Sequence, residues 1–89
     1  MAWKIELSPT ADQGLDALDR TVTRRILRFL YERVAKLENP RSLAQALQGS
    51  ELGGLWRYRV GDYRIICEIQ DKKLIVLVLR VGHRREVYR

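Results

Sequence analysis

The chain has 89 residues, of which 46% are hydrophobic and 31% are charged, and its formal net charge is +6. This length excludes two ordinary domains but allows one modest core, so we expect a single folded domain over residues 1–89. No apolar run approaches the roughly 20 residues that cross a bilayer, and the lone cysteine, Cys67, excludes an internal disulfide. With a charged N-terminus unlike a signal peptide, these features predict an intracellular, cytoplasmic protein that has no membrane partner.

The first half of the chain predicts one strand and two helices. Residues 2–7 alternate between apolar and charged side chains, which is typical of a half-buried strand. Ser8 is a suitable cap for a short helix from Pro9 to about Leu18, because proline fits the first helical position. Asp19 can cap a second helix from about Arg20 to Leu37, whose apolar residues recur on one face.

The second half predicts a connecting segment and then three strands. Asn39-Pro40 ends the second helix, and Ser42 to Leu47 is expected to form a helical turn. The three strands, joined by turns at Gly61-Asp62 and Asp71-Lys72, are Leu55–Val60, Tyr63–Gln70 and Lys73–Val81. The third strand is apolar on both faces and should be central. The order β-α-α-β-β-β predicts an α+β fold, with a helical hairpin on one face of a mainly antiparallel four-stranded sheet.

The positive charge is concentrated in the last third of the chain. Residues 1–53 contain eight Lys and Arg against seven Asp and Glu, whereas residues 54–89 contain nine against four. Most of those nine are arginines, whose planar guanidinium forks suit phosphate groups. A solvated basic surface would have the same composition, but the clustering favours a polyanionic partner, with RNA preferred.

The turn at Gly61-Asp62 predicts where three of these arginines point. A two-residue turn places Arg59 opposite Arg64, and Arg57 shares their face because side chains two apart in a strand point the same way. Like charges that face each other destabilise a sheet, so an anion is expected to fill the cluster. A loop of odd length would shift this register, and the arginines would then be ordinary exposed residues.

The C-terminal stretch adds further candidate residues. His83 is the single histidine and is suited to proton transfer. Arg84 and Arg85 can reach a phosphate, and Tyr88 can stack on a base or use its hydroxyl. Since the stretch directly follows the central strand, it is expected beside the three arginines.

Other kinds of site are not indicated by the sequence. No Cys/His metal pattern, clustered carboxylates or Gly-rich phosphate loop is present, so neither a metal nor a cofactor is predicted. Cys67 lies in mid-strand on the apolar face and is interpreted as a core residue rather than a nucleophile.

Two segments resemble a known family, the RelE branch of the RelE/ParE toxin superfamily. They are Leu55-Trp56-Arg57-Tyr58-Arg59-Val60-Gly61-Asp62-Tyr63-Arg64-Ile65-Ile66 and Val81-Gly82-His83-Arg84-Arg85-Glu86-Val87-Tyr88. The resemblance extends over nearly the whole chain and includes the order of elements. It implies a toxin of a type II toxin–antitoxin system, with a cognate antitoxin protein as partner. Toxins of this branch enter the ribosomal A site and cut messenger RNA without a metal ion, by attack of a 2′-hydroxyl on the neighbouring phosphate.

The same resemblance assigns roles to individual residues. Its basic pair corresponds to Arg57 and Arg59, its later arginines to Arg64 and Arg84, and its C-terminal tyrosine to Tyr88. These arginines would bind the phosphate, and Tyr88 would orient a base. The best-known members have lysines where this chain has arginines, and arginine is a poor general base. The base is therefore left open between His83 and Tyr88.

Two other functions fit the same sequence features. A ParE-type toxin, which poisons DNA gyrase by protein contact, shares the fold. A non-catalytic basic RNA-binding domain would need no cleavage site. The combination of Arg64, Arg84 and Tyr88 favours the endoribonuclease, because a gyrase binder does not need these residues.

Overall fold

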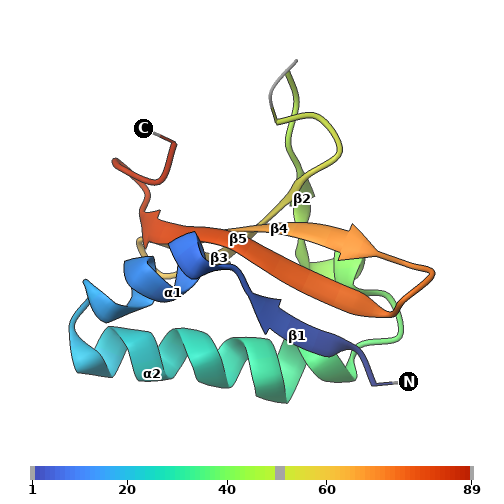
Figure 1. Ribbon diagram of the computed structural model, residues 1–89, viewed down its shortest axis with the longest axis horizontal. Coiled ribbons are helices and arrows are strands. Elements are labelled where there is room, and N and C mark those ends of the chain that lie inside the picture. The colour runs from blue at the N-terminus through green and yellow to red at the C-terminus, as the bar shows by residue number, and fades with distance from the viewer. Residues whose placement is uncertain (1, 50–51, 89) are drawn as a thin grey trace.

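In the computed structural model, which describes residues 2–49 and 52–88, a first strand, two helices and the later strands follow one another in the predicted order, with one strand more than predicted (Figure 1). The strands are β1 (Lys4–Leu7), β2 (Gln45–Ala46), β3 (Trp56–Val60), β4 (Tyr63–Gln70) and β5 (Ile75–His83). The two α-helices are α1 (Pro9–Asp16) and α2 (Arg20–Arg28). No helix in this described part of the chain is both long enough and apolar enough to span a membrane.

The helices begin where their capping residues predict. The amide of Ala11 donates to Ser8 Oγ at 3.1 Å, and the amide of Thr21 donates to Asp19 Oδ2 at 3.1 Å. The first helix ends at Asp16, two residues before the predicted end. The second continues from α2 through a π-helical turn, η1 (Phe29–Arg33), and a 3-10 turn, η2 (Val34–Lys36). The long helical stretch predicted from Arg20 to Leu37 is therefore confirmed, although its last turns are not α-helical.

The sheet has five strands rather than the predicted four, in the order β1-β5-β4-β3-β2. β1 pairs in parallel with β5, and the other pairs are antiparallel, so β5 is an inner strand, as expected. The extra strand, β2, replaces part of the helical turn predicted from Ser42 to Leu47. A 3-10 helix, η3 (Pro40–Leu43), precedes it, and Gln45 and Ala46 then pair with the free edge of β3.

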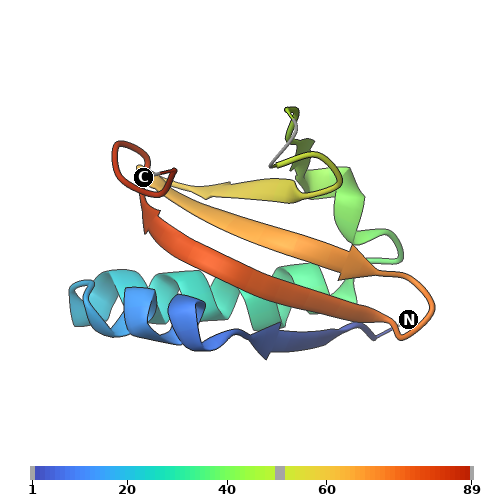
Figure 2. The ribbon, with the colours of Figure 1, turned by 45° about the horizontal axis from the view of Figure 1, so that its top comes forward.

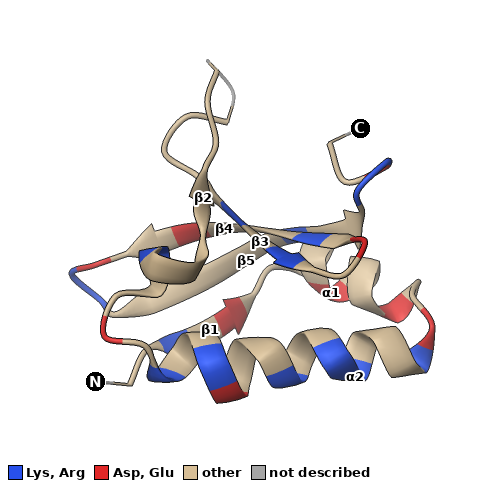
Figure 3. Ribbon diagram, turned by 180° about the vertical axis from the view of Figure 1, so that it is seen from behind, with Lys and Arg blue, Asp and Glu red and all other residues tan. Residues whose placement is uncertain are grey.

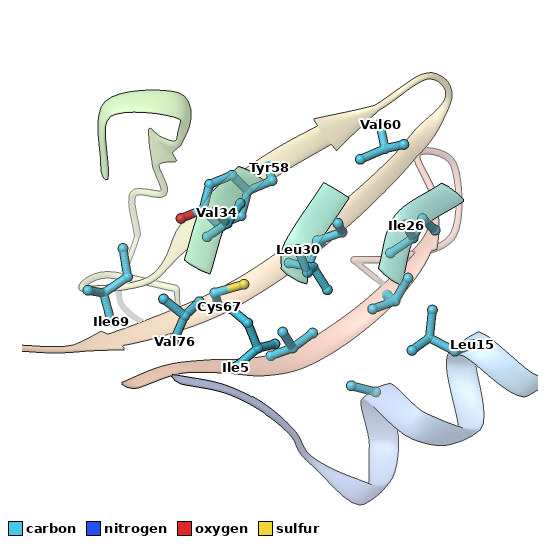
Figure 4. Close-up of a cluster of buried hydrophobic side chains, with 14 of the residues drawn as sticks. Ile5, Leu15, Ile26, Leu30, Val34, Tyr58, Val60, Cys67, Ile69 and Val76 are labelled. Atoms are coloured by element: carbon cyan, nitrogen blue, oxygen red, sulfur yellow. The ribbon is translucent and has the colours of Figure 1, made fainter. Parts of the chain in front are cut away.

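One face of this sheet is buried under the helices, and the other is open. Figures 1 and 2 show α1 and α2 together on one side, whereas the segment between β2 and β3 and the C-terminal segment project from the other side. The side chains between the sheet and the helices form the apolar core (Figure 4). Tyr58, Ile65 and Cys67 are among its fully buried members, and Cys67 is therefore a core residue, as predicted.

The first hairpin has the predicted register. Val60 pairs with Tyr63, and Arg59 pairs with Arg64, across the turn at Gly61-Asp62. Gly61 has a φ of 59°, a value that suits the first central position of a type II′ turn and favours glycine.

The second hairpin differs in detail from the prediction. β5 runs from Ile75 to His83, so it begins two residues later than predicted and extends two residues past the predicted end. A β-bulge also interrupts its pairing with β4, because Ile66 pairs with Arg80 while the next residue, Cys67, pairs with Val78. Because of the bulge, the residues of β5 that follow it point to the sheet face opposite to the one that strict alternation would give. The bulge therefore decides which of these side chains reach the open face.

Candidate nucleic-acid interface

Three arginines lie on the open face of the sheet, and we call them the arginine face: Arg57, Arg59 and Arg64. Arg57 and Arg59 come from β3, and Arg64 pairs with Arg59 from β4. Arg59 is exposed, whereas Arg57 and Arg64 are half-buried. The strand residues that alternate with them, such as Tyr58 and Ile65, point into the core. Strand alternation and the short turn thus bring the three predicted arginines together.

Arg64 is held against the hairpin turn. Its Nη1 donates to the carbonyl oxygens of Gly61, at 2.9 Å, and Tyr63, at 3.0 Å. Desolvation lowers the pKa of Arg64 from its ordinary value, and repulsion from the nearby arginines, among them Arg59 and Arg84, lowers it further. The guanidinium stays charged because an arginine pKa lies far above neutral. A bound anion would relieve this repulsion.

Arg57 connects the arginine face to two other segments. Its Nη1 donates to the Tyr88 hydroxyl at 3.0 Å, and its Nη2 donates to Gln45 Oε1 on β2. Its Nε is buried without a partner among the described residues, which is destabilising for a polar group. One explanation for such an atom is a bound group that completes its hydrogen bonding.

The C-terminal segment curls up at the end of β5 on the open side of the sheet, and it carries Arg84 to the hairpin turn and Tyr88 to Arg57. The Arg84 amide donates to the Asp62 carbonyl at 2.8 Å, and Arg84 Nε lies 4.0 Å from Asp62 Oδ1. Val87 is buried, its amide donates to the His83 carbonyl at 3.0 Å, and its own carbonyl accepts from Arg80 Nη1 at 3.1 Å. These contacts hold the turn from which Tyr88 reaches Arg57.

His83 is not part of this group. It pairs with Tyr63 across β4 and β5 and makes an edge-to-face ring contact with it, at 5.6 Å between centroids. Because Tyr63 and Arg64 are adjacent in a strand, they point to opposite faces, and His83 therefore lies on the face opposite Arg64. His83 Nδ1 accepts from the Arg85 amide at 3.2 Å, and the Arg85 side chain is exposed.

The sequence interpretation missed two residues beside the arginine face. Gln45 lies on β2, a strand that the sequence did not predict. Arg80 pairs with Ile66, and its side chain therefore points to the open face. Without the bulge, the alternation of β5 would turn Arg80 to the opposite face. No sequence signal marks the bulge that turns Arg80 to the open face. Gln45 is an ordinary polar residue in its segment, and its polarity alone gave no reason to predict that it lies at the site.

A groove of about 370 Å³ lies beside Tyr88. Apolar side chains from β4, β5 and the segment before β3 form most of its wall. It is lined by Thr10, Leu52, Leu55, Ile66, Leu79, Arg80 and Tyr88. Within the described residues, no group of three or more His, Cys, Asp or Glu side chains is arranged to hold a metal ion.

Comparison with known proteins identifies the class to which this fold and basic face belong. Residues 5–88 match the family model described as ParE toxin of type II toxin-antitoxin system, parDE. The chain therefore belongs to this toxin family, and the predicted membership of the RelE/ParE superfamily is confirmed.

Two curated relatives narrow the class. Toxin RelG of Mycobacterium tuberculosis is 28% identical over 89 residues, which are 100% of this chain and 99% of the relative. Toxin RelE of the same organism is 28% identical over 87 residues, or 98% of this chain and 87% of the relative. The chain is thus a RelE-like toxin of a type II toxin–antitoxin system.

Solved structures confirm the predicted fold class. A chain of the RelBE2 toxin–antitoxin complex of Mycobacterium tuberculosis superposes with a TM-score of 0.86 at 24% identity, over 97% of this chain and 95% of that chain. In the archaeal RelE–RelB complex of Pyrococcus horikoshii, the matched chain has a TM-score of 0.74 at 25% identity, over 98% of this chain and 100% of that chain. The isolated E. coli RelE toxin has a TM-score of 0.69 at 20% identity, over 92% and 84%.

Proposed function

We propose that the chain is a ribosome-dependent endoribonuclease that cuts messenger RNA in the ribosomal A site, without a metal ion, and so stops translation. The observation that carries the proposal is the meeting of the arginine face with Arg84 and Tyr88 on the open side of the sheet. Four guanidinium groups beside one aromatic hydroxyl suit a phosphate and its neighbouring base. The groove beside Tyr88 is mostly apolar, as the flat face of a base requires.

The proposed reaction is an internal phosphoryl transfer. The 2′-hydroxyl oxygen attacks the adjacent phosphorus and forms a 2′,3′-cyclic phosphate, while the bond from phosphorus to the 5′ oxygen of the next nucleotide breaks. The 2′-hydroxyl proton passes to a base, and the leaving 5′ oxygen takes up a proton. Negative charge grows on the phosphate oxygens in the transition state, where Arg64 and Arg84 would stabilise it. Arg57, Arg59 and Arg85 would bind the phosphate and its neighbours.

Of the two candidate bases, Tyr88 is better placed than His83. Tyr88 accepts a hydrogen bond from Arg57, so a phosphate bound to the arginine face would lie near its hydroxyl. His83 lies on the other face of the sheet, beside Tyr63. A general base must come within hydrogen-bond reach of the proton that it takes. We therefore assign the proton transfer to Tyr88.

The proposal includes three macromolecular partners: the ribosome, messenger RNA and a cognate antitoxin protein. The site of action would then be the cytoplasm, where translation takes place. The similar structure from Mycobacterium tuberculosis is a toxin–antitoxin complex and that from Pyrococcus horikoshii is a RelE–RelB complex, which supports an antitoxin partner for this chain. The open basic face would suit an acidic antitoxin segment as well as RNA.

Substitution of two arginines tests the proposed cleavage site. Loss of one transition-state donor typically costs about 2.7–4 kcal/mol, or about 10²–10³ in rate. Arg64→Ala and Arg84→Ala should each slow message cleavage by this factor and relieve the growth arrest that expression of the unmodified chain causes. Arg20→Ala, an exposed arginine on α2, is the matched control and should leave the arrest intact. The site assignments fail if both site variants are folded by circular dichroism and remain fully toxic.

A second candidate is gyrase poisoning of the ParE type, which the description of the matched family model favours. The two functions differ in what expression does to the cell. Cut messages and rapid translation arrest, measured by primer extension and amino-acid incorporation, support the endoribonuclease. Intact messages with DNA-damage signalling support the gyrase poison, and harmless expression of the chain alone supports a non-catalytic RNA-binding domain.

A further inference from the structure

A second group of arginines lies where the long helix passes the edge of β3. Arg25 of α2 touches the hairpin turn so closely that a Cβ on Gly61 would be 3.2 Å from Arg25 Nη1. Arg64 donates to the carbonyl of the same glycine. Gly61 therefore brings a helix arginine and an arginine of the arginine face to the same turn. Figure 3 shows basic segments of the strands and of α2 together on this side of the molecule.

Arg33 of η1 continues this group two helical turns further on. It lines a surface hollow of about 320 Å³ together with two residues of the arginine face, Arg57 and Arg59. Its guanidinium lies over the ring of Phe29, 5.8 Å from the centroid. The hollow is lined by Phe29, Arg33, Leu43, Ala44, Gln45, Arg57 and Arg59, none of which is acidic.

The two helix arginines are thus continuous with the arginine face but lie outside it. Eight residues separate Arg25 from Arg33, which corresponds to about 12 Å along a helix axis. Both side chains are exposed and charged. The acidic residue of α2 and η1, Glu32, pairs instead with Arg28 at 3.3 Å. A polyanion that crosses the arginine face would therefore meet further positive charge around the β3 edge.

We propose that Arg25 and Arg33 form a second phosphate-binding surface, which holds the backbone of the same RNA strand beyond the nucleotide at Tyr88. The choice of RNA as the polyanion rests on the proposed function, whereas the surface itself rests on the contacts of Gly61 and on the hollow. A single strand carries one phosphate per nucleotide, so one strand can occupy both surfaces without any base-specific contact. RNA binding should then become tighter as the strand lengthens.

Direct binding measurements separate this surface from cleavage. The ligands are two single-stranded RNAs of about 5 and about 12 nucleotides, each with a 2′-deoxy sugar at the cut position so that it stays intact. Arg25→Gln/Arg33→Gln is compared with Arg20→Gln/Arg24→Gln, which removes the same charge from exposed positions of the same helix. Dissociation constants are measured by fluorescence anisotropy at several salt concentrations, after circular dichroism has confirmed folding.

The unmodified chain and the control should bind the long RNA more tightly than the short one. Arg25→Gln/Arg33→Gln should lose roughly tenfold in affinity for the long RNA and little for the short one. Its salt dependence should fall by about 1.4 in the slope of log K against log salt, because each phosphate contact on a single strand contributes about 0.7. The single variants Arg25→Gln and Arg33→Gln should each show about half of the change in slope. If the double variant does not fold, these single variants test the proposed surface in its place.

Three results would overturn the proposal. The double variant could bind the long RNA as the control does, or the unmodified chain could gain nothing from the longer strand. Alternatively, the double variant could keep RNA binding but lose an acidic, apolar test peptide, which would assign the surface to a protein partner. A different result would separate the two proposals. If the chain cuts no message but still binds longer RNA more tightly through Arg25 and Arg33, the proposed function is refuted and the second phosphate-binding surface is supported.

Discussion

Arg57 shows how one side chain can prepare a site before the ligand arrives. Its guanidinium is fixed on one side by Tyr88 and on the other by Gln45. A donor that is already held in place loses little further freedom when it binds a phosphate, and it also keeps the tyrosine nearby. In the proposed reaction, Arg57 would therefore both bind the phosphate and position Tyr88.

The assignment of the proton transfer to Tyr88 can be tested at the same scale. Proton transfer by a positioned side chain typically contributes about 10²–10⁴ in rate. Tyr88→Phe keeps the ring for stacking but removes the hydroxyl, so kcat should fall by at least about 10² with little change in KM. His83→Gln should change kcat by less than about tenfold, because His83 lies on the other face of the sheet. Single-turnover cleavage on ribosomes supplies both constants, and equal losses in the two variants would contradict the assignment.

The accuracy of the sequence prediction differed among the site residues for geometric reasons. Arg57, Arg59 and Arg64 were placed together because a two-residue turn fixes the register of a hairpin. His83 was expected after the end of β5, but the strand continues through it, and alternation then turns it away from Arg64. Arg80 requires a bulge that depends on the packing of β5 against β4, which a single sequence does not record.

Among the elements, strand β2 could not be predicted from the sequence. Its two residues are exposed and are too few to form a pattern of alternating apolar and polar side chains, so they carry no strand signal. They form a strand because the edge of β3 offers unpaired backbone groups. The longer elements were predicted because each has its own cap, turn or apolar pattern.

Helix α1 packs closely against strand β5 at Gly14, and the stability of the fold depends on this contact. A Cβ on Gly14 would lie 2.6 Å from the Val81 carbonyl oxygen, so Gly14→Ala must push the helix away from the strand. Overpacking typically costs about 1–3 kcal/mol, whereas alanine in place of glycine in a helix gains up to about 1 kcal/mol. We expect a net loss in the free energy of unfolding, measured by urea denaturation.

Gly82→Ala is the matched control for this helix–strand contact. Its nearest neighbour would be Val87 Cβ at 3.6 Å, an ordinary contact distance. The free energy of unfolding should stay within about 0.5 kcal/mol of that of the unmodified chain. A Gly14→Ala variant as stable as this control would show that α1 can move away from β5 without cost.

In the whole molecule, the sheet separates stability from binding. One face holds the helices through a continuous apolar core, and the other presents neighbouring arginines that repel one another. The fold alone does not decide the activity, because one fold can carry different functions on its surface. The choice between the proposed cleavage site and a gyrase contact therefore rests on the residues of the open face and not on the core.

Tyr58 joins the core to the connecting segment, and its hydrogen bond contributes to the stability of the whole molecule. It is fully buried, and its hydroxyl donates to the Pro40 carbonyl at 2.6 Å. Tyr58→Phe leaves that carbonyl without this donor, at a cost of about 1–3 kcal/mol near neutral pH. Burial raises the pKa of Tyr58 well above its ordinary value near 10.

The raised pKa gives the Tyr58 contribution a pH dependence of known sign. Above about pH 10 the unfolded chain releases the Tyr58 proton while the folded chain retains it, so the stabilisation is complete below pH 10 and declines as the pH rises. The difference in the free energy of unfolding between the unmodified chain and Tyr58→Phe should therefore shrink in urea titrations above pH 10. Tyr31→Phe, at a tyrosine that is 48% exposed, is the control and should leave the free energy of unfolding near neutral pH within about 0.5 kcal/mol of that of the unmodified chain. A Tyr58→Phe difference that stays constant from pH 7 through the alkaline range would show that folding leaves the proton affinity of Tyr58 unchanged.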